Sequence, residues 1–411
     1  MSTLVINAPG SSVVVPRPRK SWLLGLIAVL VAAAAFPNLR IDLGGLQVPL
    51  HVVPLMIAVP TALRRWPRVP AQVRAWSIVF LTLFSASVLR YGSDFGDLVK
   101  MITSVITVFT VAALVRNKTD FLAGVFGLAV ALIVINARGI SGGITANVGY
   151  QPLSGIANKN AYSIYSLPAV MMAAFALMHF RQAKWSMLVL AGSVLSSVFI
   201  LFTGANRSGW GGIVLIGALL TIQARRWRAL GVVVGLGVIS YGVFTWFGSS
   251  EIFDYRLEQT TSGYESDDVR QNLLLAALEV GVENPVLGVT VQELPRELAK
   301  RTASSGDLVD PHNFIGYIAG GSGLFTLVAL FALGGSLWRR PAQAMNPQLL
   351  LAHDLLRLVL ILFVFRGMFS REVFTVAAFP IAAGLALGLS LADESENWSL
   401  VRDLTDVSHR R

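Results

Sequence analysis

The sequence predicts a polytopic transmembrane helical bundle, all-α in class and with about twelve spans, from three observations. Of the 411 residues, 54% are hydrophobic and only 14% are charged, whereas soluble domains average about 25% charged residues. The mean hydropathy is +0.65. The apolar residues also fall into long runs separated by short polar segments, which is the pattern of helices that cross a bilayer.

The apolar runs follow one another along the whole chain, and no period indicates a repeat array. Several runs are shorter than the roughly 20 residues that a perpendicular span needs. The predicted spans lie near residues 22–36, 47–63, 75–90, 98–115, 119–136, 160–179, 185–203, 208–223, 229–247, 312–337, 350–367 and 373–391.

The basic residues predict the orientation, because the cytoplasmic loops of membrane proteins are enriched in Lys and Arg. With the N-terminus placed inside, every short loop assigned to the cytoplasm carries at least two basic residues. The net charge of +10 is therefore expected from membrane topology and does not indicate binding to nucleic acid. No cleavage site follows the first apolar run, so we interpret it as an uncleaved helix rather than a signal peptide.

This topology divides the chain into five parts. Cytoplasmic tails are expected at residues 1–21 and 392–411, spans one to nine in residues 22–247, and spans ten to twelve in residues 312–391. Residues 248–311 form the one long polar interruption. We expect this segment to be an extracytoplasmic loop with an amphipathic helix.

Cationic residues gather on the extracytoplasmic side, where the positive-inside rule predicts few of them. Most lie at predicted helix ends, where an anion can meet both an Arg fork and free backbone N–H groups. An Arg at such a position also commonly extends to lipid headgroups, and for Arg371 this alternative is as good as a functional role. The other candidates are Arg138, Lys159, Arg207, Arg270 and Arg366.

Two of these arginines carry a stronger functional signal. Arg207 lies in a short Gly/Asn/Ser turn between two spans, which leaves little room to reach headgroups. Arg270 follows Ser266-Asp267-Asp268, which predicts a helix N-terminus, and this helix is expected to end before Pro285. Arg270 either pairs with an acidic neighbour in its helix or binds an anion above the bilayer.

His312 stands at the entrance of the tenth predicted span, in the sequence Asp310-Pro311-His312-Asn313. An imidazole titrates near neutral pH, so this residue suits a general base or acid. The alternative is a structural hydrogen bond to a neighbouring loop.

Several catalytic motifs are missing from the chain. There is no Walker-type phosphate loop, no Asp-x-Asp pair, no cysteine and no spacing typical of metal ligands. Chemistry on the outer side would then depend on Arg and His. Such a set suits a reaction whose leaving group is a diphosphate, because Arg forks neutralise its charge while His accepts a proton.

Four stretches between about residues 150 and 330 form a recognisable set around the long loop. They are Gly155-Ile-Ala-Asn-Lys-Asn160, Thr203-Gly-Ala-Asn-Arg207-Ser-Gly209, Arg270 with Pro285-Val-Leu-Gly288, and Pro311-His312-Asn313-Phe314 with Gly321-Ser-Gly323-Leu324. In this order they resemble motifs of the O-antigen ligase/polymerase family of polytopic bacterial glycosyltransferases. One departure is Gly288-Val289-Thr290, where the family often has Gly-x-Gly.

The resemblance implies a GT-C-like fold in the bacterial inner membrane, both termini in the cytoplasm and an active site on the extracytoplasmic face. It implies a glycan donor on polyprenyl diphosphate, such as undecaprenyl diphosphate, a glycan or glycolipid acceptor, and no metal or other cofactor. By this resemblance Arg207 and Arg270 bind the diphosphate and His312 activates the acceptor hydroxyl in one inverting displacement. Further substrate contacts are expected from Arg138, Lys159, Asn160, Asn313 and Arg366.

The sequence leaves the exact function open. A ligase transfers a finished glycan to a different acceptor, whereas a polymerase joins two lipid-linked glycans, and the motifs are common to both. The single large outer loop slightly favours a ligase. A transporter for a lipid-linked glycan also fits about twelve spans, although the polar groups gather at the outer face rather than at mid-membrane.

Overall fold

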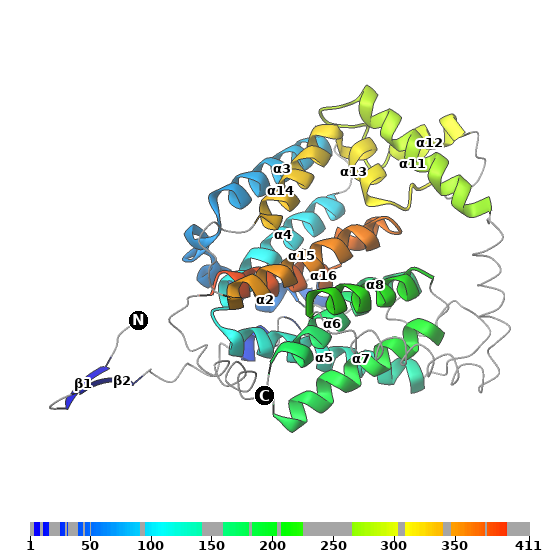
Figure 1. The fold of residues 1–411 in the computed structure, drawn as a ribbon. Helices are drawn as coiled ribbons and strands as arrows, with labels where there is room; N and C mark the ends of the chain where they lie inside the picture. The colour runs from blue at the N-terminus through cyan, green and yellow to red at the C-terminus, as the bar shows by residue number, and fades with distance from the viewer. Residues whose placement is uncertain are drawn as a thin grey trace.

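The computed structural model shows a predominantly helical protein (Figure 1). It describes residues 4–8, 11–15, 25–28, 31, 40–43, 46–49, 51–90, 95–141, 159–180, 183–203, 207–224, 265–302, 309–339, 347–374 and 376–392.

The first half of the described chain forms seven long helices and one short 3-10 helix, and their positions agree with the predicted apolar runs. The predicted run at 22–36 lies mostly outside the described residues, and the run at 229–247 lies wholly outside them. The helices are α2 (Val52–Leu63), η1 (Trp66–Arg68), α3 (Ala71–Arg90), α4 (Phe95–Leu114), α5 (Lys118–Ser141), α6 (Lys159–His179), α7 (Lys184–Thr203) and α8 (Arg207–Ala224).

The second half contains the predicted loop helix and the last apolar helices. The loop helix was expected to end before Pro285, and α11 ends at Glu283. The elements are α11 (Glu265–Glu283), α12 (Leu294–Thr302), α13 (Phe314–Ser322), α14 (Leu324–Trp338), α15 (Pro347–Gly367), η2 (Arg371–Phe374) and α16 (Ala378–Ser390).

Among the described residues, five helices are long and apolar enough to cross a membrane. They comprise Ala71–Arg90, Gly96–Leu114, Lys118–Ala137, Tyr162–His179 and Lys184–Leu201. Shorter apolar helices include α2, α14 and α16. The helical class is therefore confirmed, with five candidate membrane spans in the described residues, while a total of twelve spans stays a prediction.

Small residues allow close packing at the centre of the bundle. α16 crosses α4 at Gly384 and Gly388, where an added Cβ would lie 2.7 Å from the carbonyl oxygens of Val108 and Ala112. Backbones of membrane helices approach this closely only where one partner has no side chain. This contact fixes α4, whose first turn helps to build the candidate site.

The tenth predicted span was wrong as a single helix, because it is broken at Gly323 into α13 and α14. Gly323 has φ +91°, a backbone conformation that glycine tolerates well. The segment after α11 docks at the break, with Val289 N–H and Thr290 N–H donating to the carbonyls of Gly320 and Gly321, both at 3.0 Å. Partners for the backbone groups freed by the break explain how it is tolerated.

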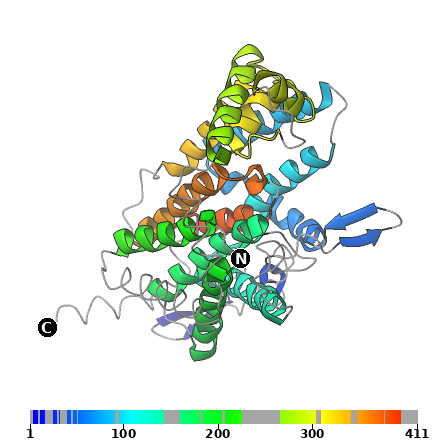
Figure 2. The same ribbon diagram turned by 90° about the vertical axis from the view of Figure 1, so that its right-hand side faces the viewer.

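Two short antiparallel hairpins were not predicted, so the all-α class holds only for the helical body. Their signals are runs of β-prone residues around Pro9-Gly10 and Gly44-Gly45. Figure 2 shows the second hairpin projecting from the helices, whereas α11, α12 and α13 pack together at one corner in both views. The strands are β1 (Leu4–Ala8), β2 (Ser11–Val15), β3 (Arg40–Leu43) and β4 (Leu46–Pro49).

Candidate functional site

The predicted site residues occupy helix ends. Helices α6 and α8 begin at Lys159 and Arg207, α13 begins directly after His312-Asn313, and α15 ends one residue after Arg366. The structure describes the backbone of Arg138, Lys159, Asn160 and Arg207 but not their side chains. We call the end of the bundle at which α6, α8 and α13 begin the site end.

Arg366 links α15 to the start of α6. Its side chain is fully buried, at 0% exposure, and its Nε donates to Ser163 Oγ at 3.0 Å. Lys159 and Asn160 precede Ser163 by four and three residues, and such positions lie on one face of a helix. The structure therefore brings three predicted substrate-binding positions to one place.

Arg207 belongs to the same neighbourhood through α8. Gly211, one turn further along that helix, packs against Phe365, so that an added Cβ would lie 3.0 Å from the ring. Phe365 is the chain neighbour of Arg366. Trp210 Nε1 also donates to the carbonyl of Leu201 at 3.0 Å, which holds the start of α8 against the end of α7.

Arg138 lies near the end of α5, beside a buried polar network. Tyr162 of α6 donates its hydroxyl to Asn136 Oδ1 at 2.6 Å, and Asn136 Nδ2 donates to Ser197 of α7 at 2.9 Å. Arg138 follows Asn136 by two residues, so it lies where α5 meets the first turns of α6. The sequence analysis did not single out this network, because serine and tyrosine are ordinary residues in membrane helices.

Arg270 lies on the face of α11 that packs against α13. Gly316 contacts Leu274 and Ala277, with an added Cβ 3.2 Å and 3.1 Å from their side chains, and Gly281 contacts Ala319. Residue numbers rise along both helices from one contact to the next, so α11 and α13 run in the same direction. Arg270 is one turn before Leu274, which places it beside the segment that precedes α13.

His312 is exposed and has a left-handed backbone, with φ +46°. Its backbone N–H donates to Asp310 Oδ1 at 2.9 Å. The next residue, Asn313, caps α13 by accepting from Ile315 N–H at 2.7 Å, and its Nδ2 donates to the carbonyl of Met368 at 3.2 Å. These contacts join the start of α13 to the end of α15, next to Arg366.

A second set of polar groups, which includes Arg371, was not predicted from the sequence to act together. Arg371 Nε forms an ion pair with Asp310 Oδ2 at 3.0 Å, and its guanidinium lies 5.5 Å from the centre of the Tyr317 ring. Tyr317 donates its hydroxyl to Asp97 Oδ2 at 2.8 Å, and Lys100 Nζ is 2.9 Å from Asp97 Oδ1. The available signal was the carboxylate of Asp97 near the start of an apolar run, since such groups are rarely without a role.

The segment after α11 explains the motif at Gly288. This glycine has φ +64°, and an added Cβ would lie 2.5 Å from the Gly321 carbonyl. Ser87 of α3 bridges both elements, with its hydroxyl 2.7 Å from the carbonyl of Leu287 and 3.1 Å from that of Gly321. Thr290, the departure from the family pattern, has φ +87°, so it adopts the conformation that a glycine favours.

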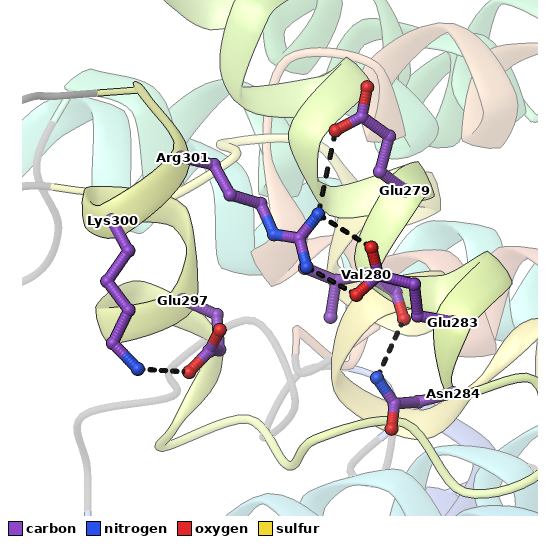
Figure 3. A network of polar contacts seen from close by, with 7 residues as sticks. All are labelled: Glu279, Val280, Glu283, Asn284, Glu297, Lys300 and Arg301. Carbon is purple, nitrogen blue, oxygen red and sulfur yellow. Dashed lines mark hydrogen bonds and ion pairs between the residues drawn. The ribbon is translucent and has the colours of Figure 1, made fainter.

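An ion-pair cluster holds α12 against α11 (Figure 3). Arg301 pairs with Glu283 through both guanidinium nitrogens and lies 3.6 Å from Glu279. The hydrogen bond from Arg301 holds the pKa of Glu283 below its usual range. Lys300 and Glu297 form a further pair within α12, at 2.6 Å. The cluster steadies the corner formed by α11, α12 and α13.

An apolar cavity lies between α14 and α15, with Phe314 at its border. Its volume is about 370 Å³. Gly334 and Gly335 leave it open, because no atom lies within 4 Å of a Cβ added at either residue. The lining includes Phe314, Phe331, Gly334, Trp338, Leu360 and Phe363. The cavity thus extends to Phe314, the residue that follows His312-Asn313.

Acidic groups do not form a metal cluster in the described part of the chain, where no three His, Asp or Glu side chains gather in a way that could hold an ion. The site end combines the N-termini of α6, α8 and α13 with several cations. Backbone N–H groups at a helix N-terminus attract anions, so this arrangement is suited to a phosphate-bearing ligand.

Comparison with curated proteins supports the resemblance that the motifs indicated. The chain is 26% identical to the O-antigen ligase of Salmonella typhimurium (strain LT2) over 261 residues, covering 59% of this chain and 62% of that protein. The chain thus spans less than two thirds of the length of this relative. No family model matches the sequence. The identified resemblance is confirmed at this level: the chain is similar to an O-antigen ligase, with apolar helices that suit a membrane protein.

Proposed function

We propose that this protein is a membrane glycosyltransferase that moves a glycan from polyprenyl diphosphate to an acceptor hydroxyl on the extracytoplasmic side. The observation that carries the proposal is the arrangement of cationic helix-end residues and helix N-termini beside His312. The similarity to an O-antigen ligase supports the same reaction class and favours a ligase.

The diphosphate is the part of the donor that the cationic residues recognise. Arg207 and Arg270 neutralise the charge that develops on the leaving diphosphate, with Arg138, Lys159 and Arg366 as further contacts. Charge-assisted hydrogen bonds from Arg to phosphate are strong and geometrically specific. In this role the arginine and lysine side chains supply the positive charge that a metal ion supplies in other enzymes, so we expect the reaction to need no metal.

His312 acts on the acceptor. Its imidazole accepts the proton of the acceptor hydroxyl as the oxygen attacks the anomeric carbon. The bond from that carbon to the diphosphate oxygen breaks in the same step, and polyprenyl diphosphate leaves with the bonding electron pair. One displacement inverts the anomeric configuration. The exposure of His312 supports this role, because a bulky acceptor has access to the residue.

The two asparagines have different roles in this proposal. Asn160 lies on the face of α6 that meets Arg366 and contacts the donor. Asn313 is 4% exposed, and both of its amide atoms bond within the protein, so it positions the segment around His312.

The apolar cavity between α14 and α15 supports a lipid-linked donor. Its border at Phe314 lies next to His312, so an isoprenoid chain in the cavity would place its diphosphate at the site end. We expect the site end to face the extracytoplasmic side of the inner membrane, with both termini in the cytoplasm, because the opposite end carries the exposed arginines Arg64, Arg68 and Arg339.

The test is transfer by purified protein in nanodiscs, with labelled polyprenyl-diphosphate glycan, a glycolipid acceptor and EDTA. We expect product from the wild type and from His409→Ala in the C-terminal tail, and a loss of about 10²-fold or more in His312→Ala. Product that joins two donor glycans would identify a polymerase. Donor binding without product for any tested acceptor would contradict an enzyme and favour a transporter.

A further inference from the structure

The left-handed backbone conformation of His312 needs a physical explanation. Residues other than glycine adopt a positive φ uncommonly, and such conformations persist where the surroundings determine them. At functional sites the geometry of one side chain depends on this kind of local constraint. The groups that constrain His312 are therefore part of its chemistry.

Asp310 is the direct constraint. Its Oδ1 accepts from the backbone N–H of His312, two residues further on, which is the pattern of an Asx turn. Pro311 between them has a fixed φ and is buried. Asn313 then begins the helix with its cap. Asp310, Pro311 and Asn313, which flank His312, thus leave the chain at position 312 little freedom.

The carboxylate of Asp310 is itself held in place. Its second oxygen forms an ion pair with Arg371 at 3.0 Å, and Arg371 lies over the ring of Tyr317. Tyr317 donates to Asp97, which pairs with Lys100. A chain of contacts therefore leads from the carboxylate through Arg371 of η2 and Tyr317 of α13 to Asp97 in the first turn of α4. Because both oxygens of Asp310 have these partners, the residue acts on the backbone of His312 rather than on its ring.

We propose that Asp310 is a positioning residue that sets the left-handed backbone of His312 and so presents the imidazole to the acceptor. Arg371 fixes the carboxylate, and Tyr317 with Asp97 fixes Arg371. This inference rests on the proposed function for the role of the imidazole. The positioning itself is a property of the fold that can be measured without any substrate.

The first experiment measures kcat and KM of transfer for Asp310→Ala, with Asp268→Ala on the exposed start of α11 as the matched control. We expect kcat of Asp310→Ala to fall roughly 10²-fold, because a misplacement of about 1 Å costs that much, while KM for the donor changes less than about twofold. Wild-type kcat in Asp310→Ala would overturn the proposal.

A second experiment separates two properties of Asp310: the oxygen that accepts from the His312 N–H, and the negative charge. Asp310→Asn keeps an oxygen for the His312 N–H but turns an NH₂ group toward Arg371. Combining it with Arg371→Gln supplies an oxygen for that NH₂ group, and we expect the double variant to be roughly tenfold faster than Asp310→Ala, because asparagine also forms Asx turns. A double variant as slow as Asp310→Ala would overturn the proposal by showing that the charge, not the turn, is needed.

Hydrogen exchange gives a readout that is independent of transfer. Peptides covering His312 to Tyr317 should exchange faster in Asp310→Ala than in the wild type, at equal melting temperature. Faster exchange without any transfer by the wild type would defeat the proposed function and leave the positioning supported. Unchanged exchange would overturn the positioning itself, whatever the activity.

Discussion

The two ends of the helical body both carry cations but hold them differently. At the site end, polar side chains bond across elements that are far apart in sequence, as in Arg366 with Ser163 and Tyr317 with Asp97. At the opposite end, where α2, α4 and α14 end, Arg65 and Arg357 make contacts of another kind, to a backbone carbonyl and to a near neighbour. Arg65 donates to the carbonyl of Ala113, and Arg357 pairs with Asp354 three residues away.

The cations at the two ends therefore suit different roles. Those at the opposite end suit membrane orientation, and those at the site end suit catalysis. An exposed cation at a membrane surface costs little and contributes to topology wherever it lies in its loop. Burying a guanidinium is costly, so buried charges are held by partners inside the protein. Arg366 is such a buried cation, with Ser163 among its partners, and it therefore suits a role that an exposed, topological charge does not have.

Replacing Arg366 is the strongest test of this comparison. Arg366→Met should lower transfer by about 10²–10³-fold, the usual loss when a charge-stabilising group is removed from an active site. The melting temperature should fall, because the replacement leaves the buried partners of the guanidinium, including the Ser163 hydroxyl, without their donor, so transfer is measured well below the melting transition of the variant. Transfer rates and thermal melts of the purified variant give both values.

Arg357→Met at the opposite end is the matched control for this variant. Arg357 stacks on Trp338 and donates to its carbonyl, so its replacement should affect packing but not transfer. Equal losses of transfer in the two variants would show that the cations at the two ends do not differ in their contribution to transfer.

Much of the bundle could be predicted from the sequence, because apolar runs report membrane helices directly. The predicted runs at 75–90 and 185–203, for example, correspond to α3 and α7. The break at Gly323 could not be predicted, since it depends on a distant segment that supplies partners for the backbone. A glycine inside an apolar run looks the same whether the helix continues or ends there.

The candidate site was predictable where residue type alone is unusual. Cations and a histidine at helix ends are rare on the extracytoplasmic side, so Arg366 and His312 were identified. Tyr317 and Ser87 were not, because their importance comes from partners 200 or more positions away in the chain, as in Tyr317 with Asp97 and Ser87 with Leu287. Arg371 was treated as equally suited to lipid contact, although it is bonded to Asp310.

The cavity between α14 and α15 gives the second test, with a smaller effect. Gly334→Leu places an isobutyl group where nothing lies within 4 Å of the added Cβ. We expect a rise of about tenfold in KM for the donor, since displacing two or three isoprenoid carbons costs about 1.4 kcal/mol or more, and no change in kcat. Gly334→Ala is the control. An unchanged KM for the donor in the leucine variant would show that the lipid does not occupy this cavity.

Thr290 gives a third test, which concerns stability. Thr290→Gly removes the strain of a positive φ but also the hydroxyl that accepts from Glu293 N–H at 3.2 Å, whereas Thr290→Ala removes only the hydroxyl. The glycine variant should therefore be more stable than the alanine variant by roughly 1 kcal/mol. Chemical or thermal unfolding of the pair measures this difference. An alanine variant of equal stability would show that position 290 is not strained.

The smallest expected effect is the pH dependence of the contact between α11 and α12. The pKa of Glu283 is lowered by Arg301, so the contact stabilises the fold above the ordinary glutamate pKa of about 4.3. This contribution is lost as the pH falls through the lower pKa of the folded state. Hydrogen exchange of α12, corrected for intrinsic rates, should show protection that is lost on acidification in the wild type.

Glu283→Gln is the test variant for this pH dependence, and Glu293→Gln is its control, because Glu293 pairs with Arg296 within one exposed stretch. The first should lack the pH-dependent protection and the second should keep it. The same acid response in wild type and Glu283→Gln would assign the protection to other groups.

The most direct measurement compares one arginine at each end by the same substitution. Arg270→Ala and Arg339→Ala both remove an exposed guanidinium, from the side of α11 next to His312 and from the end of α14. We predict that single-turnover transfer falls by about 10² in Arg270→Ala and stays within about twofold of wild type in Arg339→Ala. Equal rates in the two variants, or a larger loss in Arg339→Ala, would contradict the placement of the reaction at the site end.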